Sequence, residues 1–76
     1  MITFDDAVRK ARAQKKDIDM VVEYSKAYVF SSSNDEGTKG GINRAPVVVM
    51  KKDGQIVDMI TFVNGGTGKE MGVRNI

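Results

Sequence analysis

The chain begins with a pattern typical of an amphipathic helix. Basic residues occupy mostly one side of the first segment, and apolar residues recur on the other at helical spacing, namely Phe4, Ala7, Val8 and Ala11. Thr3 can cap the first turn, and Asp6 stands at the reciprocal position of a capping box. The pattern predicts a helix over residues 4–15 whose narrow, alanine-rich stripe lies close against a sheet.

After this helix the chain changes to the alternation of apolar and polar residues that is typical of strands. Strands are predicted over residues 19–25, 27–31, 46–52 and 55–63. Pro46 can open a strand because no ladder donor is lost at that position. Asp53-Gly54 predicts a two-residue hairpin turn with positive φ. The glycine-rich tail, residues 64–76, could add a short edge strand at residues 70–73.

These elements predict an α+β fold, with one N-terminal helix packed on a roughly four-stranded antiparallel meander sheet. A single domain over residues 1–76 accounts for the whole pattern. Residues 32–45 differ from the rest because they are rich in glycine and poor in apolar side chains. Loops longer than about 12 residues in compact domains are usually functional or disordered, so we expect this segment to matter for function.

The predicted sheet carries more apolar residues than one helix can cover. On the third strand Val47 and Val49 point to one face, and Val48 and Met50 point to the other. Antiparallel sheets with one wet face normally alternate apolar and polar residues, so the second face needs a cover. Either the loop and the tail fold across it, or it pairs with a second copy or with another protein.

Composition narrows the class of protein. With 41% hydrophobic and 29% charged residues the chain is typical of globular domains, and 12 basic against 10 acidic residues give a net charge of only +2, far short of a nucleic-acid footprint. The sequence has neither cysteine nor histidine, which excludes disulfides and argues against a zinc site. No apolar run reaches membrane-spanning length and no export signal is seen, so we expect a cytoplasmic location.

Glycines in the tail invite comparison with a phosphate-binding loop. The Walker pattern would need glycine at position 63 and serine or threonine at position 70, where the chain has Val63 and Glu70. A turn explains the glycines more simply. A nest of backbone amides for a small anion stays open as an alternative, with the candidate residues Gly40, Gly41, Gly66, Gly68 and Lys69. No acidic pair or activated serine stands out, so we expect no catalytic residues, no metal site and no cofactor.

The order of these motifs resembles the small YrhB-like bacterial immunity-protein family and short proteins of Gram-positive bacteria and their prophages. The resemblance spans residues 2–63 and is carried by Thr3 and Ala7, by Tyr28-Val29-Phe30, and by the stretch from Gly41 through Pro46-Val47-Val48-Val49 to Asp53-Gly54. The chain lacks the tryptophan expected in the second strand of that family, and its tail does not match the family's closing helix. The resemblance implies a non-catalytic protein that binds and neutralises another protein.

We therefore expect a small non-catalytic protein-binding module, of immunity or phage anti-defence inhibitor type, that occludes a partner protein. The binding surface would combine the loop with the second sheet face, and its candidate residues are Asn34, Asp35, Glu36, Lys39, Ile42, Arg44, Val48, Met50 and Met59. Two other functions stay open from the sequence: a small-anion or nucleotide-binding protein that uses the glycine-rich loops, and a structural homodimer.

Overall fold

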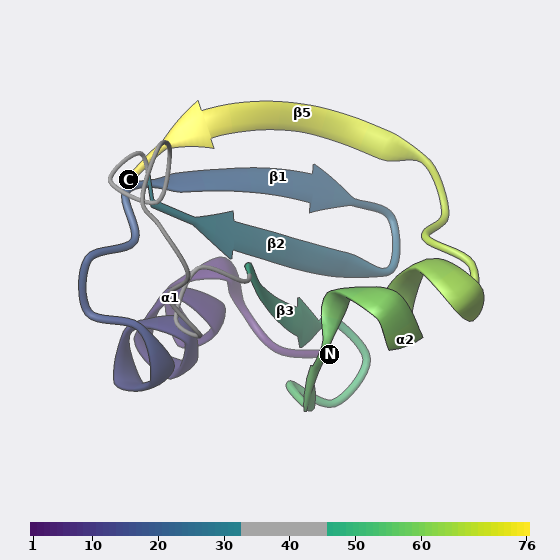
Figure 1. The fold of residues 1–76 in the computed structure, drawn as a ribbon, viewed down its shortest axis with the longest axis horizontal. Coiled ribbons are helices and arrows are strands. Elements are labelled where there is room, and N and C mark those ends of the chain that lie inside the picture. The colour runs from purple at the N-terminus through teal and green to yellow at the C-terminus, as the bar shows by residue number, and fades with distance from the viewer. Residues whose placement is uncertain (33–45) are drawn as a thin grey trace.

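The computed structural model describes residues 1–32 and 46–76, and in this part of the chain an antiparallel five-stranded sheet carries a helix on each face (Figure 1). The strand order is β4-β3-β2-β1-β5. The predicted α+β fold, with an N-terminal helix on an antiparallel meander, is therefore confirmed. The elements are α1 (Phe4–Gln14), β1 (Met20–Tyr24), β2 (Ala27–Ser31), β3 (Val47–Met50), β4 (Ile56–Val57), α2 (Met59–Asn64) and β5 (Glu70–Asn75).

Helix α1 forms where the sequence places its cap. The Thr3 side chain, on extended backbone, accepts a hydrogen bond from the Asp6 amide at 3.1 Å. This satisfies one of the amides that the first turn leaves unpaired. Ala7 and Ala11 are fully buried, so the small side chains let the helix approach the sheet closely. The predicted helix is confirmed over residues 4–14.

The face of the sheet beneath α1 holds the larger part of the core. Phe30, Val21 and Val49 are fully buried there, and each such side chain contributes about 1.5–3 kcal/mol by leaving water. Phe4 extends this core from the helix, because its ring meets the Tyr28 ring edge-on at a centroid distance of 5.2 Å. The packing explains why the central strands follow the predicted bounds to within one or two residues.

The long fourth strand predicted over residues 55–63 is wrong. Strand β4 stops at Val57, and the chain turns into helix α2. Asp58 caps this helix by accepting a hydrogen bond from the Thr61 amide at 2.6 Å. The hydrogen bonds from the Thr61 side chain and amide lower the pKa of Asp58 below its ordinary value. The turn lets Phe62, which is buried, cover the second sheet face, whereas a straight strand would leave that face bare.

The two-residue turn predicted at Asp53-Gly54 is also wrong in its geometry. Among the described residues no non-glycine residue has a positive φ, and here only Gly54 does, at 75°. The Met50 amide donates to the Gln55 carbonyl at 2.9 Å, so the hairpin loop spans residues 51–54. The Asp53 side chain accepts from the Gln55 amide at 3.0 Å, which is an Asx turn and stabilises the wider loop.

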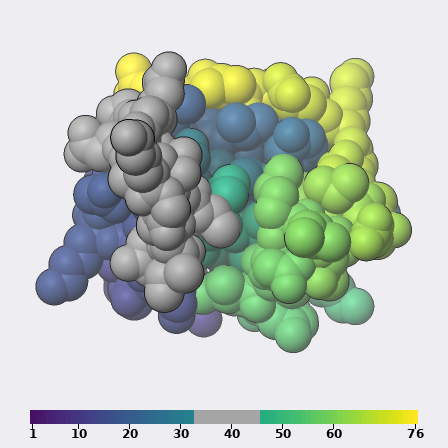
Figure 2. Space-filling model, in the orientation of Figure 1, coloured from purple at the N-terminus to yellow at the C-terminus, as the bar shows by residue number. Residues whose placement is uncertain are grey.

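The second sheet face is covered by α2, not by the tail. Figure 2 shows α2, in green, over one part of this face, while strand atoms stay visible between α2 and the yellow strand β5. The tail forms β5 instead, so the short edge strand predicted at residues 70–73 is confirmed and reaches Asn75. Apart from Ser32, the predicted loop 32–45 lies outside the described residues. No helix in the described ranges has the length and apolar character needed to cross a membrane.

Candidate functional site

Strand β5 forms the long open edge of the described sheet. It pairs antiparallel with β1 on one side, and no strand of residues 1–32 or 46–76 pairs with its other side (Figure 1). All six of its residues are exposed. The opposite edge, β4, comprises only Ile56–Val57. An edge of this length offers unpaired backbone groups to another strand.

The register of β5 on β1 decides which peptide groups face outward. The Ile76 amide donates to the Asp19 carbonyl at 3.0 Å, next to the pair Met20–Asn75. In an antiparallel ladder this bond identifies Met20–Asn75 as a pair that does not exchange hydrogen bonds. The next pair, Val21–Arg74, therefore exchanges both hydrogen bonds. Arg74 therefore directs its peptide groups to β1. Val73, one residue earlier, directs its N–H and C=O away from β1 and into the open edge.

The side of β5 that faces α1 carries charge. Lys51 Nζ lies 2.7 Å from Glu23 Oε2, and Arg74 Nη2 lies 3.1 Å from Glu23 Oε1. The Lys51 ammonium also stands 4.9 Å from the centroid of the Tyr28 ring. The hydrogen bond from Lys51 is the main cause that holds the pKa of Glu23 below its ordinary value; partial burial opposes it, and the positive charges of Lys51 and Arg74 add to it. Glu23 is thus a carboxylate at neutral pH.

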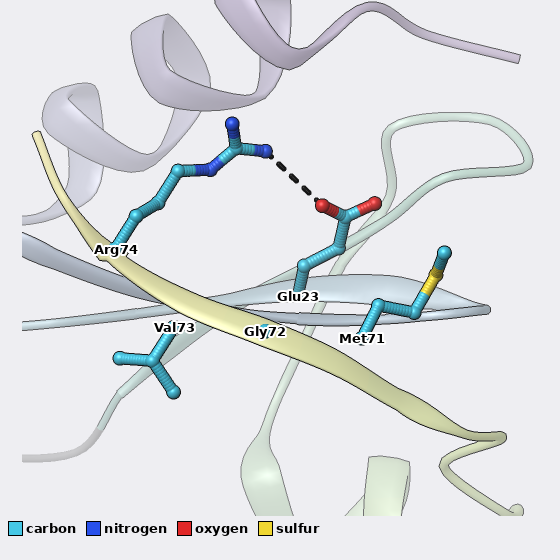
Figure 3. A pocket seen from close by; sticks show the side chains of 5 residues that line it. All are labelled: Glu23, Met71, Gly72, Val73 and Arg74. Carbon is cyan, nitrogen blue, oxygen red and sulfur yellow. Dashed lines mark hydrogen bonds and ion pairs between the residues drawn. The ribbon is translucent and has the colours of Figure 1, made fainter.

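A bulge opens a hollow beside this carboxylate. Glu23 pairs with Gly72 but Tyr24 pairs with Glu70, so Met71 is an extra residue in β5. Its sulfur lies 3.9 Å from Lys51 Nζ, on the charged side. A Cβ built on Gly72 would meet no atom within 4 Å. The resulting hollow, of about 260 Å³ and shown in Figure 3, is lined by Glu23, Met71, Gly72, Val73 and Arg74.

The other side of β5 continues an apolar row. Figure 3 shows the Val73 side chain pointing away from the side that carries Arg74 and Glu23. The row is buried under Phe62 of α2 at its centre, but Val73 at its end is 59% exposed. An apolar row that ends at an unpaired strand edge favours a partner strand there. Cross-strand pairing aligns its members in the order Val57, Val48, Val29, Val22 and Val73.

The glycines of the tail have structural roles. The Gly66 amide donates to the Val63 carbonyl at 3.2 Å, and its φ of 91° ends α2 in the way typical of a helix C-cap. Gly68 has a φ of 75°, and a Cβ there would collide with Ser25 Oγ. The Lys69 amide donates to Ser25 Oγ at 3.0 Å. The amides of Gly66 and Lys69 are thus used within the protein and are not directed at an anion. Gly40 and Gly41 lie outside the described residues.

Three of the predicted partner-binding residues lie in the described part of the chain, and all three belong to the cluster beneath α2. Val48 is fully buried beneath α2, so its placement on an exposed sheet face is corrected, and Met50 and Met59 are half-buried around the same cluster. The other candidates lie outside the described residues: Asn34, Asp35, Glu36, Lys39, Ile42 and Arg44. The residues that do gather at the open edge were not singled out from the sequence: Glu23, Met71, Val73 and Arg74. Met71 and Val73 fall in the edge strand expected at residues 70–73, whereas no local pattern connects Glu23 or Arg74 with that edge.

Comparison of the chain with protein-family models, with curated proteins and with solved structures finds no match. The class of the molecule is therefore defined by the fold of residues 1–32 and 46–76, an α+β fold whose sheet has one long open edge in this part of the chain. Among the described residues, no group of three or more acidic side chains is arranged to hold a metal ion. The open edge of β5, with its charged side and its apolar side, is the candidate site.

Proposed function

We propose that the protein is a non-catalytic binding module that pairs the open edge of β5 with an extended segment of another polypeptide chain. The observation that carries this proposal is the outward direction of the Val73 peptide groups on a fully exposed edge strand. Adding a strand to a sheet edge is a recurring mode of peptide recognition, in which main-chain hydrogen bonds supply affinity and alternate side chains supply specificity.

The two sides of β5 describe the segment that would fit. Each main-chain hydrogen bond adds a net ~0.5–1.5 kcal/mol, so a few bonds need help from side chains. Val73 offers an apolar contact on one side of the added strand. On the other side the hollow at Gly72 places the Glu23 carboxylate near the edge. A segment with an apolar residue toward Val73 and a basic residue toward Glu23 therefore matches best.

The finer role that we propose is neutralisation of a partner by occlusion, as the resemblance to the immunity-protein family implies. A partner whose own strand is engaged by β5 cannot use that strand elsewhere. Support comes from the absence of histidine and cysteine in the sequence. It also comes from the amides of Gly66 and Lys69, which form hydrogen bonds within the protein and are not directed at an anion. These features favour recognition over catalysis or anion binding.

The test is to pan a displayed library of short extended peptides against the protein and two variants. Val73→Pro removes the outward N–H while leaving the hydrogen bonds of Arg74 to β1 in place. Val73→Thr keeps both the N–H and a β-branched side chain. We expect peptides that bind the parent and Val73→Thr but lose at least tenfold in affinity for Val73→Pro. Absence of binding peptides, or binding that Val73→Pro leaves unchanged, would contradict the proposal.

A further inference from the structure

We propose that the extended segment is β5 of a second copy of the same chain, and that the two strands pair antiparallel about Val73. This inference rests on the proposed function, because it names the partner of the same edge. It joins two five-stranded sheets into one continuous sheet with a two-fold axis at Val73. Three features of the edge support this pairing: its hydrogen-bonding groups, its charged side and its apolar side.

The hydrogen-bonding groups narrow the possible registers. In an antiparallel pair, two residues can exchange both hydrogen bonds only when the peptide groups of each point at the other strand. Val73 meets this condition opposite Val73 of the partner subunit, because its peptide groups point outward. A centre at Arg74 would place the guanidinium groups of the two copies directly opposite each other, and like charges in that position are destabilising.

A centre at Gly72 fails for a different reason. It would oppose Val73 with Met71 of the partner subunit, and directly opposite residues must share a face of the sheet. The bulge places the Met71 sulfur on the side of Lys51, while Val73 points to the other side (Figure 3). The two side chains could not lie side by side, so the register about Val73 is the one that the edge favours.

In this register the charged sides are complementary. Gly72 lies opposite Arg74 of the partner subunit, and Gly72 leaves the hollow of about 260 Å³ beside Glu23. The guanidinium of one copy thus faces the carboxylate side of the other, twice by symmetry. Arg74 is suited to this exchange because its side chain is 52% exposed although it contacts Glu23 of its own chain. Opposite charges across paired strands are favourable, whereas like charges would repel.

The apolar sides are continuous as well. Val73 ends the valine row that crosses the sheet and is 59% exposed there. Opposite Val73 of the partner subunit it becomes the middle of a longer row, and both exposed side chains lose contact with water. The same pairing satisfies the outward peptide groups of both strands. One arrangement thereby accounts for the hydrogen bonds, the hollow and the exposed valine.

The first measurement is the solution mass of the parent protein, Val73→Pro and Val73→Thr by light scattering over a range of concentrations. We expect a twofold mass for the parent and for Val73→Thr at high concentration, and the mass of one chain for Val73→Pro. Far-ultraviolet circular dichroism checks that Val73→Pro is folded. A parent that stays monomeric, or a folded Val73→Pro that stays dimeric, overturns the inference.

Single cysteines test the register without relying on the proline variant, because the sequence has no cysteine of its own. Two residues that exchange hydrogen bonds have Cα atoms about 5.5 Å apart, which suits a disulfide. Val73→Cys should therefore cross-link to a dimer under mild oxidation. The matched control is Asn75→Cys, equally exposed, whose two copies would lie about 14 Å apart along the strands. Equal or faster cross-linking of Asn75→Cys contradicts the register.

The results also separate this inference from the proposed function. A monomeric parent that binds displayed peptides, with loss of binding in Val73→Pro, overturns self-pairing and leaves the edge as a site for another protein. A monomeric parent without such peptides overturns both. A dimer that persists in Val73→Pro uses another surface, and it too overturns the inference.

Discussion

Lys51 Nζ lies 2.7 Å from Glu23 Oε2, and this ion pair joins the loop after β3 to β1 across strand β2. The two side chains are only 11% and 23% exposed, so the pair is shielded from solvent far more than a surface pair. Glu23 also forms an ion pair with Arg74 of β5. Through Glu23, Lys51 therefore connects the hairpin loop to the open edge. The shape of the candidate site therefore depends on a residue that lies outside it.

Replacing Lys51 with methionine should destabilise the protein. The change keeps most of the apolar stem but leaves the partly buried Glu23 carboxylate with Arg74 alone. Removing one partner of a shielded charged hydrogen bond costs about 1–3 kcal/mol. Urea denaturation measures the loss, and Lys52→Met is the matched control because Lys52 is exposed. Surface changes of that kind stay within about 0.5 kcal/mol, so equal effects of the two variants would refute the role of Lys51.

The stability of the parent should fall at acidic pH in part through Glu23. Its pKa is lower in the folded chain than its ordinary value, mainly because of the hydrogen bond from Lys51. Between the folded and the unfolded pKa the unfolded chain binds more protons, so stability rises with pH in that window. The contribution is present above the ordinary glutamate value of about 4.3 and is lost as pH falls through the folded pKa.

The measurement is the urea midpoint of the parent and of Glu23→Gln from neutral to strongly acidic pH. We expect the difference between the two to be largest near neutral pH and to shrink as pH falls below the ordinary glutamate value. Lys51→Met should show a weaker pH dependence than the parent, because the main cause of the shift is gone. A difference between parent and Glu23→Gln that is constant with pH would contradict this assignment.

Gly68→Ala should loosen the tail from the turn between β1 and β2. Its φ of 75° disfavours alanine, and the added Cβ would collide with Ser25 Oγ. Where the backbone conformation is incompatible, the loss exceeds about 1 kcal/mol. Ser25→Ala removes the colliding oxygen but also the acceptor for the Lys69 amide. We expect the double variant to lose less stability than the sum of the two single variants, as measured by urea denaturation. If the losses of the two single variants simply added in the double variant, an alanine Cβ at position 68 would not be in close contact with Ser25 Oγ.

Phe62→Ala should test whether α2 is the cover of the second sheet face. Phe62 is 3% exposed, and its ring meets that of Tyr24 edge-on at 5.5 Å. Truncating such a side chain costs about 3–5 kcal/mol, a large share of the stability of a small domain. Ile60→Ala is the control in the same helix, because Ile60 is 75% exposed. Thermal unfolding that responds equally to both substitutions would mean that α2 does not pack as described.

Much of the fold follows from local patterns. The cap formed by Thr3 and Asp6 and the helical spacing behind it are enough to place α1. Alternation and β-branched residues place β1, β2 and β3, since these segments are bounded by polar or glycine-rich stretches. Such signals act within a few residues, so they can be recognised without knowledge of the tertiary contacts.

The end of the chain could not be predicted in the same way. Ile60, Thr61 and Val63 favour a strand, while Asp58 and Gly65 mark the start and the end of a helix. These local preferences conflict, and the outcome depends on the uncovered sheet face that Phe62 fills. The sequence pattern does not say which edge of the sheet the tail joins, and in the structure β5 pairs with β1.

Local patterns along the chain are enough to place helix α1, strands β1, β2 and β3, and the excess of apolar residues that needs a second cover. The segment that supplies this cover, and the position of the open edge, follow from the packing of the folded chain. The cause is separation along the chain. Glu23 and Arg74 meet although 51 positions separate them, and Val73 becomes an edge residue only because β5 returns to β1. Contacts of that range depend on the packing of the whole sheet and leave no local pattern to read.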